Sequence, residues 1–179
     1  MTPQPFSQLE TTFLPLFSQF LTSRGETAEH STHAAHLVLP LIVAGFAKTA
    51  TQPQHATTLT EWFTDSLLSD TTTDSATLIA WGKPRLPILL GGNAADVAAE
   101  LAQQSQLSKT TAGALLALAV PLVFRTLHPL ATQRPALLAQ LSQQYSWLNQ
   151  QLNPAMLTAL GIGNLYGLMH QLNSMARVV

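Results

Sequence analysis

The strongest constraint on the fold of this chain is a pair of long apolar segments that begin 81 residues apart and share one layout. Thr27 and Ser108 each stand where a helix N-cap is expected, and Pro40 and Pro121 follow at matching positions within the apolar run. Alternation of apolar and polar residues, typical of half-buried strands, is almost absent. We therefore predict an all-α fold with an internal repeat of two apolar helices, each kinked by its proline.

The prolines have a cost that the fold must offset. A proline inside a helix lacks the N–H that bonds one turn back, which leaves the carbonyls of His36 and Ala117 without their usual partners. The simpler explanation is that a kink lets a very apolar helix wrap around its neighbours. The alternative is that a ligand or a partner uses the free carbonyls.

Helical spacing of apolar residues, together with capping residues and prolines, predicts the other elements. We expect about eight or nine helices in a single all-α domain spanning residues 1–179. Asn93 is expected to cap one of them, Pro15 to bend the first, and Pro154 to begin the last. The expected helices cover residues 6–21, 28–48, 58–68, 94–104, 109–127, 135–151 and a final segment from 154 onwards, with a short segment 86–90 between a break at 81–85 and a turn at 91–93.

Charge is unusually sparse and limits the possible functions. The 179 residues include eight Lys or Arg and nine Asp or Glu, a charged fraction of 9% with a net charge of -1, against about 25% in typical soluble domains. Scattered basic residues do not form the positive surface that nucleic-acid binding needs, so we expect no nucleic-acid partner. The chain is also too apolar for intrinsic disorder. The absence of cysteine excludes disulfides, thiolate zinc sites and a cysteine nucleophile.

The sequence indicates a cytoplasmic protein. The first basic residue is Arg24, so the start of the chain lacks the basic-then-apolar pattern of a signal peptide. The longest uncharged apolar run, 112–124, is flanked by Lys109 and Arg125 and is shorter than the roughly 20 residues of a membrane-spanning helix. We therefore expect no transmembrane segment.

Two further motifs accompany the repeated segment: Leu89-Leu90-Gly91-Gly92, and a Gln-Gln-Ser-Gln-Leu-Ser approach to the second copy at 103–108. With them, the chain resembles the YidB-like family of bacterial proteins, known as domain of unknown function 937. The resemblance covers residues 24–131, and 135–179 are identified as added C-terminal helices. It implies a helical fold, and it implies no activity because none is established for the family.

One cluster of possible metal ligands occurs at the start of the first apolar segment. At 100° per residue, His30, His33 and His36 span an arc of about 120°, too wide for all three to bind one ion. Glu29 and His33, four residues apart, are a better pair, and zinc or nickel would suit these groups. The matching positions of the second segment hold Thr111, Ala114 and Ala117, so the fold itself does not need histidine there. An ordinary solvent-exposed helix start is the favoured interpretation, with Glu29, His30 and His33 as candidate ligands.

Two other surfaces are candidates for interaction. The arc of His33 and His36 continues to Ala44, whose counterpart in the second segment is Arg125. This small, polar-tolerant face should either make a close helix contact or face solvent, as a partner surface or as a plain exposed stripe. Gly163 and Gly167 would form a close-packing face on the final helix, which we expect to dock either on its own domain or on a second copy.

The function that this pattern favours is not catalytic. No serine lies in a nucleophile elbow, and no phosphate-binding loop or paired carboxylates occur, so we assign no catalytic residue and no cofactor. The leading hypothesis is a non-enzymatic interaction or scaffolding protein that associates with itself or with a protein partner, against a monomer surfaced with Gln and Thr. The alternative is a helical pocket for a small molecule or a lipid, with metal dependence through Glu29, His30 and His33.

Overall fold

A computed structural model describes residues 6–70 and 74–178, and in these two stretches every regular element is helical. This confirms the all-α fold class. Short 3-10 turns, among them η2 (Ser66–Leu68) and η3 (Lys83–Arg85), join some of the helices. The helices are α1 (Phe6–Ser23), α2 (Ala28–Ala50), α3 (Ala56–Phe63), α4 (Ser75–Gly82), α5 (Leu86–Leu89), α6 (Ala94–Ser105), α7 (Lys109–Leu127), α8 (Arg134–Ser142), α9 (Tyr145–Gln151), α10 (Pro154–Leu160) and α11 (Leu165–Arg177).

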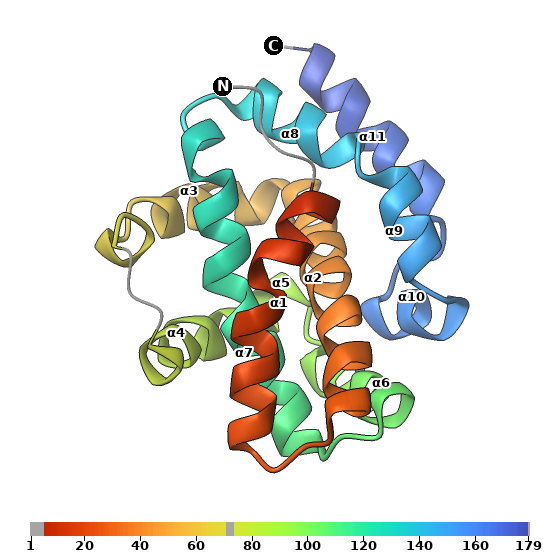
Figure 1. Ribbon diagram of the computed structural model, residues 1–179. Coiled ribbons are helices and arrows are strands. Elements are labelled where there is room, and N and C mark those ends of the chain that lie inside the picture. The colour runs from red at the N-terminus through yellow and green to blue at the C-terminus, as the bar shows by residue number, and fades with distance from the viewer. Residues whose placement is uncertain (1–5, 71–73, 179) are drawn as a thin grey trace.

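The two repeated segments form α2 and α7, which contact each other at the centre of the molecule, with the other helices around them (Figure 1). Their N-caps are as expected: the Thr27 hydroxyl accepts from the His30 N–H at 3.4 Å, and the Ser108 hydroxyl from the Thr111 N–H at 3.1 Å. Each helix continues without interruption through its proline. Burial of nearly every apolar side chain on both helices supplies the stability that offsets the prolines, at about 25 cal/mol per Å².

By length and composition, α2 and the segment Lys109–Leu130 could each cross a membrane. In this structure 83% and 72% of their most apolar windows are buried inside the protein, as in the core helices of soluble proteins. The absence of a transmembrane segment stays a prediction.

An aromatic cluster fixes α3 and α4 to the central pair. The ring of Phe124 on α7 lies 5.1 Å from Phe46 of α2, 4.8 Å from Phe63 of α3 and 5.6 Å from Trp81 of α4, measured between ring centroids. Edge-to-face and tilted contacts at these separations add to the burial energy. One side chain of α7 thus organises three other helices.

Gly82, at the end of α4, allows a very close approach between α4 and α7. A Cβ atom at this position would lie 1.9 Å from the carbonyl oxygen of Ala117, a distance that no side chain can occupy. This carbonyl is the one that Pro121 leaves without its helical partner. The backbone of α4 therefore packs directly against the carbonyl that Pro121 leaves free, so the chain itself occupies this position instead of a ligand or partner.

Several element boundaries differ from the sequence prediction. The expected helix 58–68 ends at Phe63, and α4 was not expected at all. The expected helix 135–151 is split into α8 and α9, and the final segment is split into α10 and α11 at Gly161, whose φ of 71° is left-handed. Asn93 stands at the N-cap position of α6, but its side chain makes no capping hydrogen bond, so that prediction is wrong.

The C-terminal helices α8 to α11 all contact α2, and polar contacts add to this docking. The Lys48 ammonium of α2 donates to the Leu160 carbonyl at 3.0 Å, where its charge also suits the negative end of α10. A Cβ at Gly161 would lie 2.7 Å from this ammonium, so glycine leaves room for it. α11 packs on α8 through the buried side chains of Leu165, Met169 and Leu172.

We predict that Gly82→Ala lowers the free energy of unfolding by about 2 kcal/mol or more, because the added methyl group forces α4 away from α7. Gly113→Ala is the matched control, since a Cβ at this α7 position meets nothing within 4 Å. It should be neutral or stabilising by about 0.5–1 kcal/mol. Chemical denaturation of both variants measures this, and equal stabilities would contradict the close crossing.

Candidate functional site

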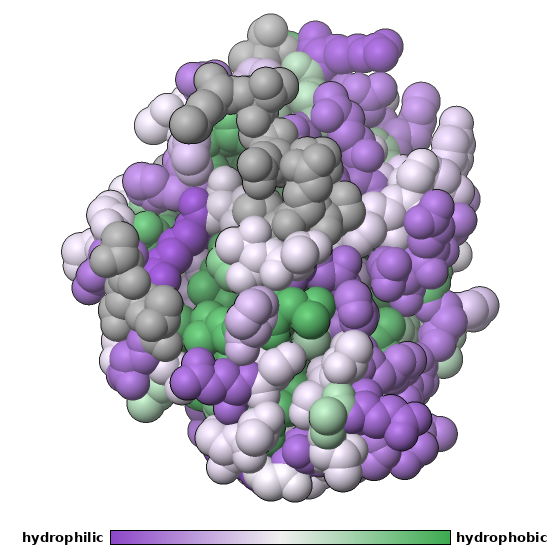
Figure 2. All heavy atoms as spheres, viewed as in Figure 1, coloured by the Kyte–Doolittle hydropathy of each residue, from purple (hydrophilic) through white to green (hydrophobic). Residues whose placement is uncertain are grey.

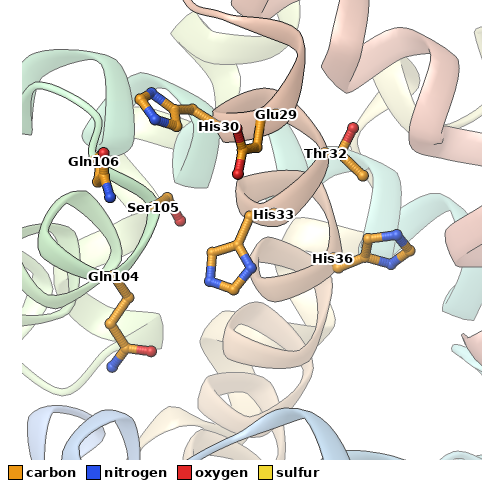
Figure 3. Close-up of a pocket in the computed structure, with 8 residues that line it drawn as sticks. All are labelled: Glu29, His30, Thr32, His33, His36, Gln104, Ser105 and Gln106. Carbon is orange, nitrogen blue, oxygen red and sulfur yellow. The ribbon is translucent and has the colours of Figure 1, made fainter.

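The histidine cluster lines an open hollow of about 590 Å³ between the first turns of α2 and the C-terminal end of α6 (Figure 3). The lining combines imidazoles, amides, hydroxyls and a single carboxylate. The lining residues are Glu29, His30, Thr32, His33, His36, Gln104, Ser105 and Gln106. The sequence had indicated only the wall contributed by α2.

The α6 wall depends on an unusual backbone conformation. Gln106 ends α6 with φ 57° and ψ 37°, the left-handed conformation that usually requires glycine. Among the described residues it is the one non-glycine with positive φ. The N–H groups of Gln106 and Leu107 both bond to the Ala102 carbonyl, which closes the helix. The Gln104 side chain is fixed by Asn153, whose amide donates to Gln104 Oε1 at 2.7 Å.

The three histidines point in different directions. His30 and His33 lie on the side of α2 nearest α6, whereas His36 is turned toward α1 (Figure 3). There, His36 Nδ1 lies 2.9 Å from Oε1 of Glu10, a largely buried side chain of α1. This agrees with the expectation that all three would not share one ligand, and it shows that His36 joins two helices.

Glu29, His30 and His33 share the hollow but do not converge on one point. Within the part of the chain that the structure describes, no group of three His, Asp or Glu side chains has a metal-binding arrangement. Ser105 adds a buried hydroxyl that has no hydrogen-bond partner there. Chemically, this arrangement can hydrogen-bond a small polar ligand, or bind a cation through two side chains of α2.

Ala44 and Arg125, two other predicted interaction residues, both make contacts within the fold. Ala44 is fully buried, so the prediction that it lies on a partner surface is wrong; this part of α2 makes a close helix contact. Arg125 donates from Nη2 to the Leu67 carbonyl at 3.0 Å, which ties η2 to α7. Desolvation lowers the pKa of Arg125, and Asp70 partly opposes that shift.

Gly163 and Gly167 are both exposed; Gly163 lies just before α11, and Gly167 lies in its first turn. A Cβ at Gly163 would meet nothing within 4 Å, and one at Gly167 would touch only the Asn164 side chain. The prediction that α11 docks on its own domain through these glycines is therefore wrong, because its leucine and methionine face does so. Contact with a second copy stays a prediction.

Sequence reasoning missed a charged and aromatic cluster at the α3–α4 corner. The Arg85 guanidinium lies 3.8 Å from the Trp81 ring centroid and 5.5 Å from that of Trp62. It donates to the Trp81 carbonyl at 2.6 Å, and its Nη2 lies 3.6 Å from Oδ2 of Asp65. Trp81 and Arg85, four residues apart, were the available signal. Because Arg85 contacts both tryptophans and Asp65, it connects α3 with α4.

Asp65 makes the stability of this corner depend on pH. The N–H of Leu67 lowers the pKa of Asp65 most, and the nearby Trp81 lowers it further; burial opposes them, and Arg85 lowers the pKa by the smallest amount. A lowered pKa means that the carboxylate stabilises the fold above its unfolded-state pKa, and that this contribution is lost as the pH falls.

We predict that Asp65→Asn lowers the free energy of unfolding at pH 7 by about 0.5–1 kcal/mol, since the carboxylate is partly exposed. The difference from the wild type should shrink as the pH falls from 5 toward 2. Glu61→Gln, an exposed position on α3, is the control and should change little. Urea titrations across this pH range measure both, and a difference that stays constant would refute the role given to the charge.

The comparisons with known proteins agree with the resemblance seen in the sequence. Residues 14–129 match the model of the family described as "Bacterial protein of unknown function (DUF937)". No curated protein and no solved structure matches the chain. The matched segment holds α2, α7 and both walls of the hollow, whereas α8 to α11 lie beyond it. Since it covers more than half of the sequence, this chain belongs to the DUF937 family of bacterial proteins.

Proposed function

We propose that this protein is a non-enzymatic interaction or scaffolding protein that associates with itself. The observation that carries the proposal is the sparse charge: eight basic and nine acidic residues among 179, with a net charge of -1. A protein of nearly zero net charge has little electrostatic repulsion between copies, so contacts between neutral surfaces are not opposed.

The distribution of the charges adds support. Arg85 and Asp65 face each other, and Arg125 bonds to the Leu67 carbonyl, so part of this small set serves the fold itself. Neutral polar residues such as Gln, Thr, Ser and Asn make up much of the remaining surface. Figure 2 shows hydrophobic atoms between the polar ones on the face that α1 crosses, and the partly buried side chains of Phe13 and Leu16 belong to that helix.

Light scattering over a hundredfold dilution tests self-association. The protein should show a mass above that of the 19.3 kDa chain at high concentration, and the mass should fall on dilution. Because few charges are involved, the midpoint should change little between about 0.05 and 0.5 M salt. A monomer mass at every concentration would contradict the proposal, and a midpoint that moves strongly with salt would contradict its electrostatic basis.

A second candidate function is the binding of a small ligand in the open hollow between α2 and α6. Glu29, His30 and His33 line it together with the hydroxyl of Ser105 and the amide of Gln104, a suitable environment for a small polar ligand or a divalent cation. Neutral imidazole and ionised carboxylate are the forms that bind metal, so binding would weaken at acidic pH.

Titration calorimetry with zinc and with nickel tests the metal form of this hypothesis. One ion per chain should bind at pH 7.5, more weakly at pH 5.5, and His33→Ala should abolish binding. His55→Ala, at a histidine outside the hollow, is the matched control and should bind as the wild type does. Absence of binding heat with either metal, or equal binding by both variants, would eliminate the metal form of this hypothesis.

A further inference from the structure

We propose that the exposed side of α11, centred on Tyr166, is the surface through which two copies of this chain associate. This inference rests on the self-association proposed above, and it names the residues that carry the contact. It concerns a part of the chain that lies outside the segment matched by the family.

The large apolar side chains that are exposed lie near the C-terminal end of the described chain. Among the described residues, the exposed large hydrophobic side chains are Tyr166, 64% accessible, and Val178, 85% accessible, and both belong to the C-terminal region. The apolar residues of α1, such as Phe13 and Leu16, are partly buried against the core. Large exposed aromatic side chains are typical centres of protein interfaces, because they bury much area on contact.

Two neighbouring rings hold the side chain of Tyr166 in place. Tyr145 of α9 packs against it in a T-shaped arrangement with 5.7 Å between centroids, and the His170 ring lies nearly parallel to it at 6.4 Å. An aromatic side chain that is fixed before contact loses little conformational entropy on binding. Tyr166 is therefore a rigid, exposed anchor.

An open hollow of about 310 Å³ lies beside Tyr166. Its floor includes the buried side chain of Met169, and amides and hydroxyls form its edge. It is therefore suited to receive a tyrosine ring with its hydroxyl. The lining residues are Ser142, Gln143, Tyr145, Tyr166, Met169, His170 and Asn173.

The absence of charge favours a second copy as the partner. None of the lining residues is Asp, Glu, Lys or Arg, and Arg177 in the last turn is the one charged residue of α11. In a two-fold contact each residue near the axis meets its own copy, so any charge there would repel itself. A strongly charged partner would find no complementary group here, whereas a second neutral copy meets no repulsion.

The exposed glycines allow such a copy to approach closely. Gly163 lies just before α11 and Gly167 follows Tyr166, and a Cβ at Gly163 would stand in open space. The backbone is therefore accessible beside the anchor. In this arrangement Tyr166 of each copy enters the hollow of the other, and the two α11 helices lie across the two-fold axis.

Sedimentation velocity over a concentration series tests the surface, with the full chain and two variants of it. Tyr166→Ala should raise the dissociation constant at least tenfold, and Gln103→Ala, on the exposed side of α6, should leave it unchanged. Circular dichroism should show the same helix content for all of them, because both positions are exposed. If the wild type associates and Tyr166→Ala associates equally well, this surface is wrong while self-association stands. If the wild type is monomeric throughout, both proposals fail.

Charge exchange tests the two-fold arrangement itself. Tyr166→Lys and Tyr166→Glu should each associate poorly alone, because like charges meet near the axis. An equimolar mixture of the two should associate more strongly than either, and high salt should weaken that gain. A mixture that behaves as the average of its components would overturn the two-fold contact.

Discussion

The contact on which the rest of the structure depends is the approach of Gly82 to the carbonyl of Ala117 in the middle of α7. Pro121 removes the helical partner of that carbonyl, and only a glycine can bring another backbone so close to it. This crossing places Trp81 against Phe124 and thereby gathers Phe46 and Phe63 into one aromatic cluster. The carbonyl that Pro121 leaves free in α7 thus determines where α4 docks.

The central helices could be predicted from the sequence because their signals are local. Caps, apolar length and a matched proline lie within each segment, and the structure has α2 and α7 where these signals place them. The division of 135–151 was not visible, since the turn at Gln143 and Gln144 contains neither glycine nor proline. α4 was missed because it is short and follows a polar stretch.

For the hollow, only one wall was accessible to sequence reasoning. Helical geometry correctly separates His36 from His30, since 100° per residue turns them apart by about 120°. The opposite wall comes from Gln104 to Gln106, far along the chain from Glu29 to His36, and it depends on tertiary packing. Its left-handed Gln106 gave no signal, because that conformation is normally marked by glycine. Gly163 and Gly167 led to the wrong prediction of a packed glycine face, because both are exposed.

We propose that the α2–α7 core carries the fold and that α11 carries the contact between copies. Hydrogen–deuterium exchange at concentrations above and below the association midpoint tests it most directly. The amides of α2 and α7 should be the most protected and should not change with concentration, while those around Tyr166 to Gln171 should gain protection on association. Gain of protection at the start of α2, with none in α11, would contradict the claim.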